Sequence, residues 1–410
     1  QSEQLTGVLP KDYTMFSDEL LAELLRIFNN SALDEVGGDI IGRIYEYFLN
    51  KFAKNIAQDD GVFFTPKSLV KMIVNVLEPA GGILLDPACG SGGMFVQTGD
   101  FVNAAGMEAN SAMTFYGQEK VEYNAQLCLM NMAVHGLNGI IKSGDEANTF
   151  YHDAHNLDGC CDYVMANPPF NLKGWYDDNQ KNDSRWADYQ TPPESNANYA
   201  WILHILSHLK ALKGVAGFLL SNGALGDSDT LEIRKKLIQN DKVEAIIILP
   251  RELFITTDIS VTLWILNQNK KGGEYHGRIL RNREKELLFM DLRTWTENPV
   301  KNESKKKVLL SSEQIQKAAG IYHTWQSEGT DGANYAVPEL YRSVKTDEIE
   351  KKSWSLVPSK YIEFIDHDLE IDYAAEMSRV QKEMREVLAQ EMKSQKMLED
   401  AFRGIGYGIE

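Results

Sequence analysis

The sequence predicts an α/β protein with a mostly parallel, Rossmann-like sheet of seven strands, flanked by helical segments. Three observations support this. Short apolar runs alternate with helix-like patterns over residues 61–270. Most gaps between the runs are long enough for a crossover helix, which parallel neighbours require. The last gap, Pro250–Ile259, is too short for a crossover helix, so the seventh strand should run antiparallel.

We expect residues 1–60 to form an N-terminal helical segment, because apolar side chains recur at helical spacing between residues 14 and 58. The sequence begins at Gln1 and not with Met. This is the pattern of a fragment, or of a chain that has lost an N-terminal segment. We therefore expect the helical segment to be truncated.

The strand candidates within residues 61–270 are continuous apolar runs. Continuous runs are typical of strands that are buried on both faces of a sheet. In chain order they are Ile83–Asp86, Thr114–Gln118, Gly139–Lys142, Asp162–Ala166, Val215–Leu220, Val243–Leu249 and Ser260–Leu266. We expect helices on both sides of this sheet and a catalytic domain that ends near residue 270.

Residues 271–410 are expected to form a mixed and helical C-terminal region, which follows a polar, turn-forming stretch. A further strand is predicted at Leu287–Asp291. A helix is predicted at Ser311–Trp325, with Ser311 or Ser312 as its cap.

The last part of the chain carries apolar residues at heptad-like intervals from Met377 to Leu398. Charged residues and glutamines fill the positions between them. This pattern indicates a long helix with an apolar stripe. Such a stripe suits either a partner helix or packing on the chain's own domain, and the sequence leaves both open.

The net charge of −17 restricts the class of function. A protein that binds nucleic acid unaided is usually basic, at least locally. Either nucleic acid is not the substrate, or binding is local and a partner supplies most phosphate contacts. No apolar run is long enough to cross a bilayer and no signal-peptide pattern opens the chain, so we expect no membrane association.

The four cysteines are spaced neither as a zinc site nor as a disulfide framework, which favours the reducing cytoplasm. Two histidine pairs, His152 with His155 and His204 with His208, have spacings that could hold a metal ion. Solvated or packed histidines explain them better. We expect no metal site.

The most informative motif is the tetrapeptide Asn167, Pro168, Pro169 and Phe170, which follows the predicted strand Asp162–Ala166. Neither proline can donate a ladder hydrogen bond and both have a fixed φ, so the strand must stop there. The result is a stiff corner with an amide, backbone carbonyls and an aromatic face. These groups suit a planar ring that carries an amino group. A Pro-rich loop that only closes the strand is the alternative.

A Gly-rich loop follows the first predicted strand and precedes a helical pattern. Its residues are Asp86, Pro87, Ala88, Cys89, Gly90, Ser91, Gly92 and Gly93. The glycines allow a ligand to approach the backbone N–H groups at a helix start. Glu119, at the end of the second strand, can accept hydrogen bonds from both ribose hydroxyls of a nucleoside. The loop lacks the Lys of a nucleoside triphosphatase, and Cys89 is interpreted as a packed thiol.

The order of these motifs resembles that of the S-adenosylmethionine-dependent DNA adenine-N6 methyltransferases. Phe63, Phe64, Thr65 and Pro66, just before the first strand, resemble that family's remaining cofactor motif. Asp145, after Gly144, resembles the acidic position behind the third strand.

More narrowly, the chain resembles the modification subunit of type I restriction-modification systems. The segments that are similar to this subunit are Asp39–Phe48, Ser195–Trp201 and Gly214–Gly223.

The resemblance implies a methyltransferase sheet and transfer of a methyl group from S-adenosylmethionine to N6 of an adenine flipped out of DNA. The implied catalytic residues are Asn167, Pro168, Pro169 and Phe170. The implied cofactor-binding residues are Phe63, Phe64, Thr65, Pro66, Asp86, Gly90, Ser91, Gly92, Gly93, Glu119 and Asp145. The implied partners are DNA, a specificity subunit, a restriction subunit and a second copy of this chain.

Two positions keep two interpretations each. Asp145 would face the amino group of the cofactor's adenine, or is only a turn residue. Phe254, after the sixth strand, would cover the far face of the target base, or is a core residue.

Two other functions are compatible with parts of the pattern. One is an amino-group methyltransferase for protein glutamine or RNA, which shares the Asn-Pro-Pro motif. The Phe-Thr-Pro segment and the helices ahead of the sheet argue against it. The other is a non-catalytic subunit that binds DNA or a partner, and the intact Asn167 and Gly-rich motifs argue against that.

Overall fold

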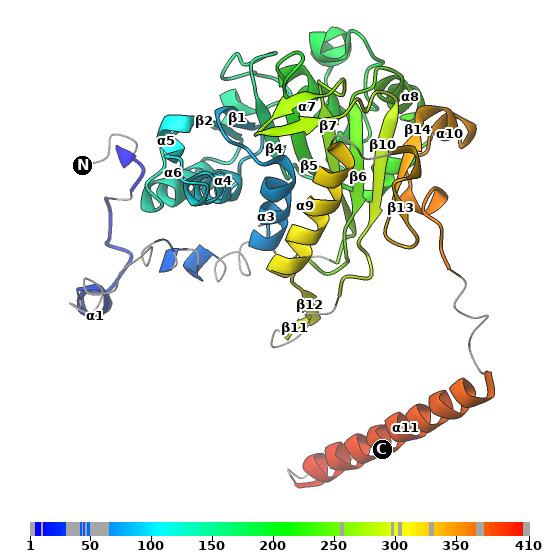
Figure 1. The fold of residues 1–410 in the computed structure, drawn as a ribbon. Helices are drawn as coiled ribbons and strands as arrows, with labels where there is room; N and C mark the ends of the chain where they lie inside the picture. Colours follow the sequence, from blue (N-terminus) through cyan, green and yellow to red (C-terminus); the bar gives the residue numbers. More distant parts are fainter. Residues whose placement is uncertain are drawn as a thin grey trace. The chain divides into compact units, whose positions relative to one another are not determined.

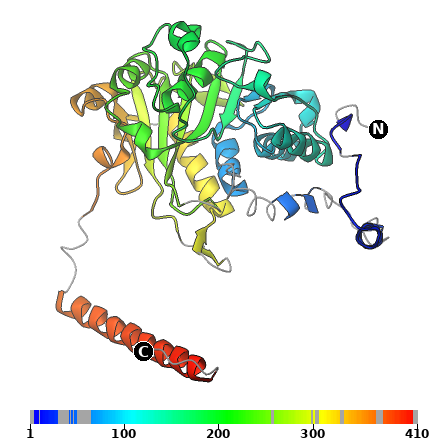
Figure 2. The ribbon, with the colours of Figure 1, turned by 180° about the vertical axis from the view of Figure 1, so that it is seen from behind.

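The computed structural model describes residues 5–9, 11–29, 42, 44–45, 47–49, 65–254, 258–296, 299–301, 306–327, 332–365 and 373–404. Contacts divide the chain into two compact units, Gln1–Glu363 and Phe364–Glu410. The first unit contains a large sheet with helices on both faces (Figures 1 and 2). The second is a single long helix in its described part, α11 (Tyr373–Gly404).

One ten-stranded sheet organises the first unit, in the order β13-β14-β10-β6-β7-β5-β4-β1-β2-β3. Its strands are β1 (Gly82–Asp86), β2 (Met113–Glu119), β3 (Gly139–Ser143), β4 (Tyr163–Ala166), β5 (Val215–Ser221), β6 (Val243–Ile248), β7 (Val261–Asn267), β10 (Glu286–Asp291), β13 (Ala336–Val337) and β14 (Tyr341–Lys345). Two small hairpins lie outside this sheet, namely β8 (Gly273–Tyr275) with β9 (Arg278–Leu280) and β11 (Pro299–Lys301) with β12 (Lys306–Val308).

All seven predicted strands are present, and β7 runs antiparallel to both of its neighbours, as the short gap before it predicted. The prediction of a seven-stranded sheet is wrong in number. β10 pairs in parallel with β6, and β14 and β13 continue the sheet antiparallel. An open edge at β6 would leave its backbone groups unpaired, and β10 satisfies them. The expected boundary at residue 270 therefore falls inside one continuous sheet.

Helices cover both faces of the sheet because its strands are apolar on both sides. One face packs against α3 (Lys67–Leu77), α4 (Gly93–Ala104), α6 (Glu122–Val134) and α9 (Ser312–Gln326). The other packs against α7 (Asn198–His208), α8 (Leu231–Gln239) and α10 (Thr346–Lys351). Leu84 and Leu85, neighbours on β1, belong to opposite cores, as the alternation of side chains along a strand requires.

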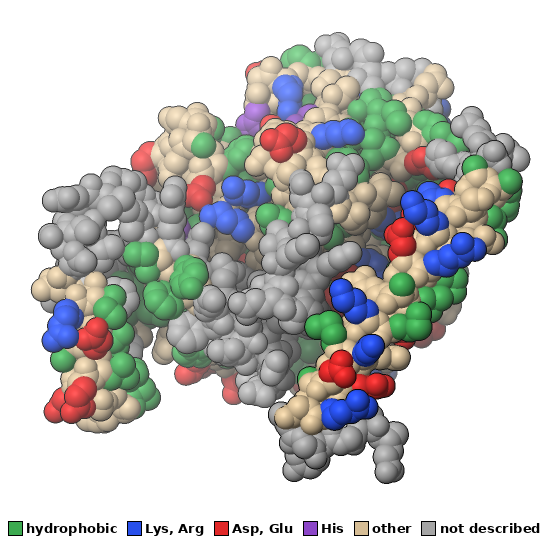
Figure 3. All heavy atoms as spheres, turned by 90° about the horizontal axis from the view of Figure 1, so that it is seen from below, with side chains coloured by type: hydrophobic (Ala, Val, Ile, Leu, Met, Phe, Trp, Pro, Cys, Tyr) green, Lys and Arg blue, Asp and Glu red, His purple; other side chains and the backbone are tan. Residues whose placement is uncertain are grey.

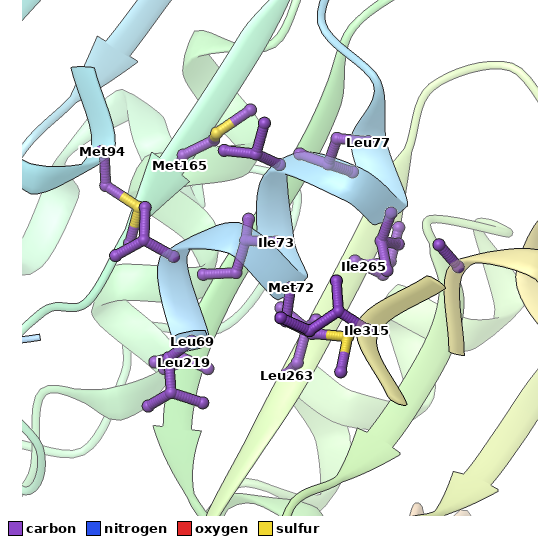
Figure 4. Close-up of a cluster of buried hydrophobic side chains, with 14 of the residues drawn as sticks. Leu69, Met72, Ile73, Leu77, Met94, Met165, Leu219, Leu263, Ile265 and Ile315 are labelled. Carbon is purple, nitrogen blue, oxygen red and sulfur yellow. The ribbon is translucent and has the colours of Figure 1, made fainter. Parts of the chain in front are cut away.

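Helix α3 shows how sequence pattern becomes packing. Its apolar residues recur at three- and four-residue spacing, so they share one face of the helix. Figure 4 shows Met72 and Ile73 of this helix among Leu219 of β5 and Leu263 of β7. The helix therefore lies across the middle of the sheet, next to α9.

The remaining described elements are short or terminal. They are α1 (Asp18–Phe28), α5 (Ala109–Ala112) and the 3₁₀ turns η3 (Asp145–Ala147), η4 (Asp178–Asn182), η5 (Ser184–Trp186), η6 (Asn222–Leu225), η7 (Gly332–Asn334) and η8 (Pro358–Lys360). Among the residues that the model describes, no helix is long and apolar enough to span a membrane.

Two helix predictions outside the sheet are confirmed, and one is covered only in part. Ser311 caps α9, and its hydroxyl accepts a hydrogen bond from the N–H of Gln314 at 3.2 Å. The long C-terminal helix is present as α11. Of the predicted N-terminal helices, α1 is observed, while residues 30–41 and 50–64 lie outside the described residues.

A buried ion pair joins the C-terminal extension of the first unit, residues 271–363, to the sheet. Glu244 of β6 accepts a hydrogen bond from Arg283 at 2.8 Å, and both side chains are fully buried. The same carboxylate accepts hydrogen bonds from Asn267, Tyr322 and Gln326. Burial opposes the charge of Glu244, but Arg283 and these donors outweigh it and lower the pKa of the carboxyl. The pair thus ties β7, α9 and the approach to β10 to the centre of the sheet.

We predict that Glu244→Ala destabilises the protein by about 3–5 kcal/mol, because it leaves the charge of Arg283 buried and unpaired. Urea unfolding followed by far-ultraviolet circular dichroism measures this loss. The control Glu284→Ala removes an exposed carboxylate nearby and should change stability by less than about 0.5 kcal/mol. Equal effects of the two substitutions would contradict the role of the pair.

Candidate active site

Three neighbouring parallel strands deliver the candidate site residues to one edge of the sheet. β1 lies between β2 and β4 and is parallel to both. Asp86 and Glu119 are the last residues of β1 and β2, and Asn167 directly follows β4. The chain continues from β1 to β2 on one side and reaches β4 on the other. Such a switch point opens a crevice at the carboxyl ends of the strands.

A cavity of about 380 Å³ occupies this crevice. Gly90, Glu119, Asn167 and Pro169 all line it, so the structure brings the Gly-rich loop, the acidic residue and the Pro-Pro corner together. A volume of this size is in the range of ligand pockets for small organic molecules.

The Gly-rich loop takes the conformation for which glycine is suited. Gly90 and Gly92 have φ of 50° and 79°, in the left-handed region. A Cβ on Gly92 would come within 2.7 Å of Cys128 Sγ, whereas one on Gly90 would meet no atom within 4 Å. The loop is therefore held tightly on its protein side and open at Gly90, which lines the cavity. Helix α4 begins directly after it, at Gly93.

The side chain of Glu119 connects this loop to the start of α6. Its carboxylate accepts hydrogen bonds from the N–H of Gly90 at 3.0 Å and of Val121 at 2.8 Å. Burial raises the pKa of Glu119, although these bonds oppose the shift. Asn124 is a third, side-chain partner of this carboxylate, which lines the cavity and can accept a further hydrogen bond from a ligand.

The corner after β4 presents an acceptor without a partner. The side-chain amide of Asn167 donates from Nδ2 to Thr65 Oγ1 at 2.8 Å. Its oxygen, Oδ1, is buried and has no hydrogen-bond partner among the described residues. A buried acceptor of this kind loses free energy until a donor reaches it. Asn167 lines the cavity, so the donor can come from a ligand.

Phe170, the aromatic residue of the corner, packs against a second aromatic ring. The ring of Phe170 meets Phe254 edge-to-face, with ring centroids 6.0 Å apart. Phe254 is fully buried, so the structure favours the core interpretation for this residue.

The other predicted site residues divide into three groups. Pro66 is the N-cap of α3, next to Thr65. Asp145 is exposed in η3 and lines an adjoining depression with Asn148 and Tyr151, not the cavity itself. Phe63 and Phe64 lie outside the described residues.

Cys89, His204 and His208 are buried, whereas His152 is exposed. The thiol of Cys89 is buried, which confirms the prediction of a packed thiol, and a hydrogen bond with Cys128 together with burial raises its pKa well above the ordinary value. His204 is fully buried, which lowers its pKa, and His155 contacts the carbonyl of Gly117 at 2.9 Å. No group of three or more potential metal ligands is found in the described part of the chain.

The sequence patterns missed an aromatic wall of the cavity. Phe150, Trp175 and Trp201 all line it, and the Phe150 ring centroid lies 4.4 Å from that of Trp201 and 5.0 Å from that of Trp175. Trp201 belongs to the segment Ser195–Trp201, which was a usable signal. Phe150 and Trp175 stand in loops without regular spacing, so no periodicity marked them.

Comparison with known proteins identifies the family. Residues 36–369 match the family model described as N-6 DNA Methylase. The chain belongs to the N-6 DNA methylase family. It is a methylase subunit of the type I restriction-modification class, and its activity is adenine-specific N6 methylation of DNA. DNA is thereby favoured over protein glutamine or RNA as the substrate.

The similar proteins are type I methylase subunits. The chain is 34% identical to the type I restriction enzyme HindI methylase subunit of Haemophilus influenzae, over 99% of this chain and 90% of that protein. It is also 34% identical to the MjaIX methylase subunit of Methanocaldococcus jannaschii, over 90% of this chain and 64% of that one.

A solved structure supports the fold alone. It is the type I methyltransferase subunit of Streptococcus thermophilus, with a TM-score of 0.64 and 22% identity over 80% of this chain and 64% of that chain.

Asp86, the last residue of β1 at the cavity edge, carries a buried carboxyl group. Burial, opposed by the N–H of Ala88 and reinforced by the charge of Glu119, raises the pKa of Asp86 to about 8. In the unfolded chain an Asp titrates near pH 4, so the folded state binds the extra proton between about pH 4 and pH 8. The free energy of unfolding therefore decreases as the pH rises from about 4 to about 8, because the buried carboxyl must give up this proton.

We predict that Asp86→Asn stabilises the ligand-free protein more at pH 8 than at pH 5, because the amide never has to ionise. Thermal unfolding at the two pH values measures the difference in Tm between variant and wild type. Asp145→Asn, at an exposed position, is the control. A Tm difference for Asp86→Asn that is the same at both pH values would refute the assignment.

Proposed function

We propose that this chain transfers the methyl group of S-adenosylmethionine to N6 of an adenine that is flipped out of DNA into the corner at Asn167. The observation that carries this proposal is the buried Oδ1 of Asn167 beside the cavity, which no group of the described residues hydrogen-bonds. An amino group carries the donors that such an acceptor lacks.

The corner residues act on the amino group by hydrogen bonding. Asn167 Oδ1 and the backbone carbonyl of Pro168 each accept one N6 hydrogen. Two acceptors draw the nitrogen toward tetrahedral geometry and free its lone pair. Thr65 holds the Asn167 amide with Nδ2 turned away, so Oδ1 is the atom left for the base. Phe170 stacks on the flipped base, which contributes about 1–3 kcal/mol.

The cavity fits the cofactor that the family uses. When bound, S-adenosylmethionine supplies a sulfonium-activated methyl group, so no covalent enzyme intermediate is required. Gly90 is open to the cavity, since a Cβ there would meet no protein atom within 4 Å. The backbone at Ser91, Gly92 and Gly93 faces the methionine portion.

Glu119 accepts a hydrogen bond from the ribose hydroxyls. Asp86 orders the Gly-rich loop, since its carboxylate accepts a hydrogen bond from the N–H of Ala88. Thr65 and Pro66 close the cofactor side. Phe63 and Phe64, which lie outside the described residues, belong to the same predicted cofactor motif. Asp145 contacts the cofactor's adenine from the adjoining depression.

The charge of the chain supports a division of work with a partner. On the face shown in Figure 3, the Lys and Arg side chains of the described residues are scattered singly or in small groups among other residues. With a net charge of −17, this chain is poorly suited to hold a DNA duplex alone. A specificity subunit supplies most DNA contacts and selects the adenine, in a complex that includes a restriction subunit and a second copy of this chain.

Helix α11 is the surface that we propose for this partner. Its described side chains are not buried, and its apolar residues recur along one stripe. They include Met377, Val380, Met384, Val387, Leu388 and Met392. A helix of 32 residues with such a stripe is suited to pairing with helices of the specificity subunit.

We predict that substitutions of Asn167 in the corner and of Glu119 affect different steps of the reaction. Asn167→Ala should abolish methyl transfer and leave S-adenosylmethionine affinity intact, since it removes only the acceptor for the base. Glu119→Ala should weaken cofactor binding by about tenfold or more, because it removes charge-assisted hydrogen bonds. Calorimetry with S-adenosylmethionine and tritium transfer to unmethylated genomic DNA measure the two effects. Full activity of Asn167→Ala would sink the proposed role.

We also predict that Met384→Lys with Leu388→Lys prevents assembly with the specificity subunit, because it places two charges on the apolar stripe. Co-purification of the two subunits should be lost, while S-adenosylmethionine binding persists. Glu386→Lys also adds positive charge, but on the opposite side of the helix, and should leave assembly unchanged. If the double variant assembles normally, α11 is not the contact.

A further inference from the structure

The residue directly after the catalytic corner has an unusual backbone. Asn171 follows Phe170 and has a φ of 53°, in the left-handed region. Residues other than glycine rarely adopt this conformation, and Asn tolerates it best because of its short polar side chain. The chain therefore turns sharply behind the Phe170 ring, and some interaction must hold this turn in place.

Side chains from two other elements supply that interaction. Asn171 Oδ1 accepts hydrogen bonds from Asn198 Nδ2 at 2.9 Å, from Ser221 Oγ at 3.1 Å and from Asn196 Nδ2 at 3.1 Å. In return, the N–H of Asn171 donates to Asn198 Oδ1 at 2.9 Å. Asn198 is the first residue of α7, and Ser221 is the last of β5.

Asn171 itself is exposed, but two of its partners are buried, and water replaces the bonds of buried groups poorly. Asn198 is 4% exposed and Ser221 is 7% exposed. Loss of one partner would leave buried polar atoms unsatisfied. The geometry also assigns different roles to the two amides. Asn171 uses its side chain only as an acceptor in these bonds, whereas Asn198 both donates to Asn171 and accepts from it.

We propose that Asn171, Asn198 and Ser221 form a positioning hub that holds the turn after Phe170, and with it the Phe170 ring, where a flipped adenine stacks. These are positioning residues, since they act through Phe170 and the backbone of the corner. The inference rests on the proposed function, because it assumes that the base stacks on Phe170. It makes the hub a determinant of the transfer step and not of cofactor binding.

The different roles of the two amides predict opposite outcomes for one chemical change. Asn171→Asp keeps an oxygen that accepts all three donors, and Asp also tolerates the left-handed region. Asn198→Asp removes the donor to Asn171 and sets a carboxylate against Asn171 Oδ1. The first variant is expected to retain most of the transfer rate. The second is expected to lower kcat about tenfold or more, since small misplacements at a reacting centre are costly.

The experiment uses the chain in complex with its specificity subunit, with S-adenosylmethionine and saturating unmethylated genomic DNA as substrates. For each variant, kcat, the KM for S-adenosylmethionine and the Tm are measured. Ser221→Ala removes a single donor and should give a smaller loss of kcat, which keeps the test valid if Asn198→Asp does not fold. Asn240→Asp, an exposed amide on the far end of α8, is the matched control and should behave as wild type.

A fall in kcat for Asn198→Asp and Ser221→Ala, with an unchanged KM for S-adenosylmethionine and retained activity of Asn171→Asp, supports the hub. Equal losses for Asn171→Asp and Asn198→Asp overturn it, as does a loss that follows only Tm or the KM for the cofactor. Failure of the proposed function itself would show separately, as full activity of Asn167→Ala.

Discussion

Parallel pairing of β1 with β2 on one side and with β4 on the other brings three strand ends to one edge of the sheet. Each end carries a group of different chemistry: the Gly-rich loop after Asp86, the carboxylate of Glu119 and the amide of Asn167. None of these groups forms a site alone. The cavity exists because the strand order reverses between β1 and β4, where no crossover helix fills the edge.

The edge is held together by polar contacts between segments that are distant in the sequence. Glu119 binds the backbone of Gly90, Thr65 orients Asn167, and Asn198 supports Asn171. Each contact satisfies groups that are buried or partly buried, so each is costly to break. Asn167 Oδ1 has no hydrogen-bond partner among the described residues, and the proposed chemistry requires it as an acceptor.

The C-terminal extension is fixed to the sheet on the side away from this edge. β10 closes the β6 edge, and the buried pair of Glu244 with Arg283 holds the extension to the sheet centre. Helix α11 belongs to a separate compact unit and keeps its apolar stripe exposed. The chain thus combines a catalytic unit with an element suited to assembly, which agrees with the proposal that another subunit supplies most DNA contacts.

The sequence by itself determined the elements and the chemistry at their ends. Apolar runs set the seven strands, the Pro-Pro pair ended β4, and the glycines marked the loop before α4, because these features depend on neighbouring residues. The short gap before β7 even predicted its direction. Only the tertiary structure decided that the predicted strand Leu287–Asp291 joins this sheet as β10 and that β14 and β13 extend it. It also decided the exposed position of Asp145 outside the cavity, and the bonds of Asn167 to Thr65 and of Asn171 to Asn198. Edge pairing and hydrogen bonds between distant segments depend on proximity in space, which no local periodicity encodes.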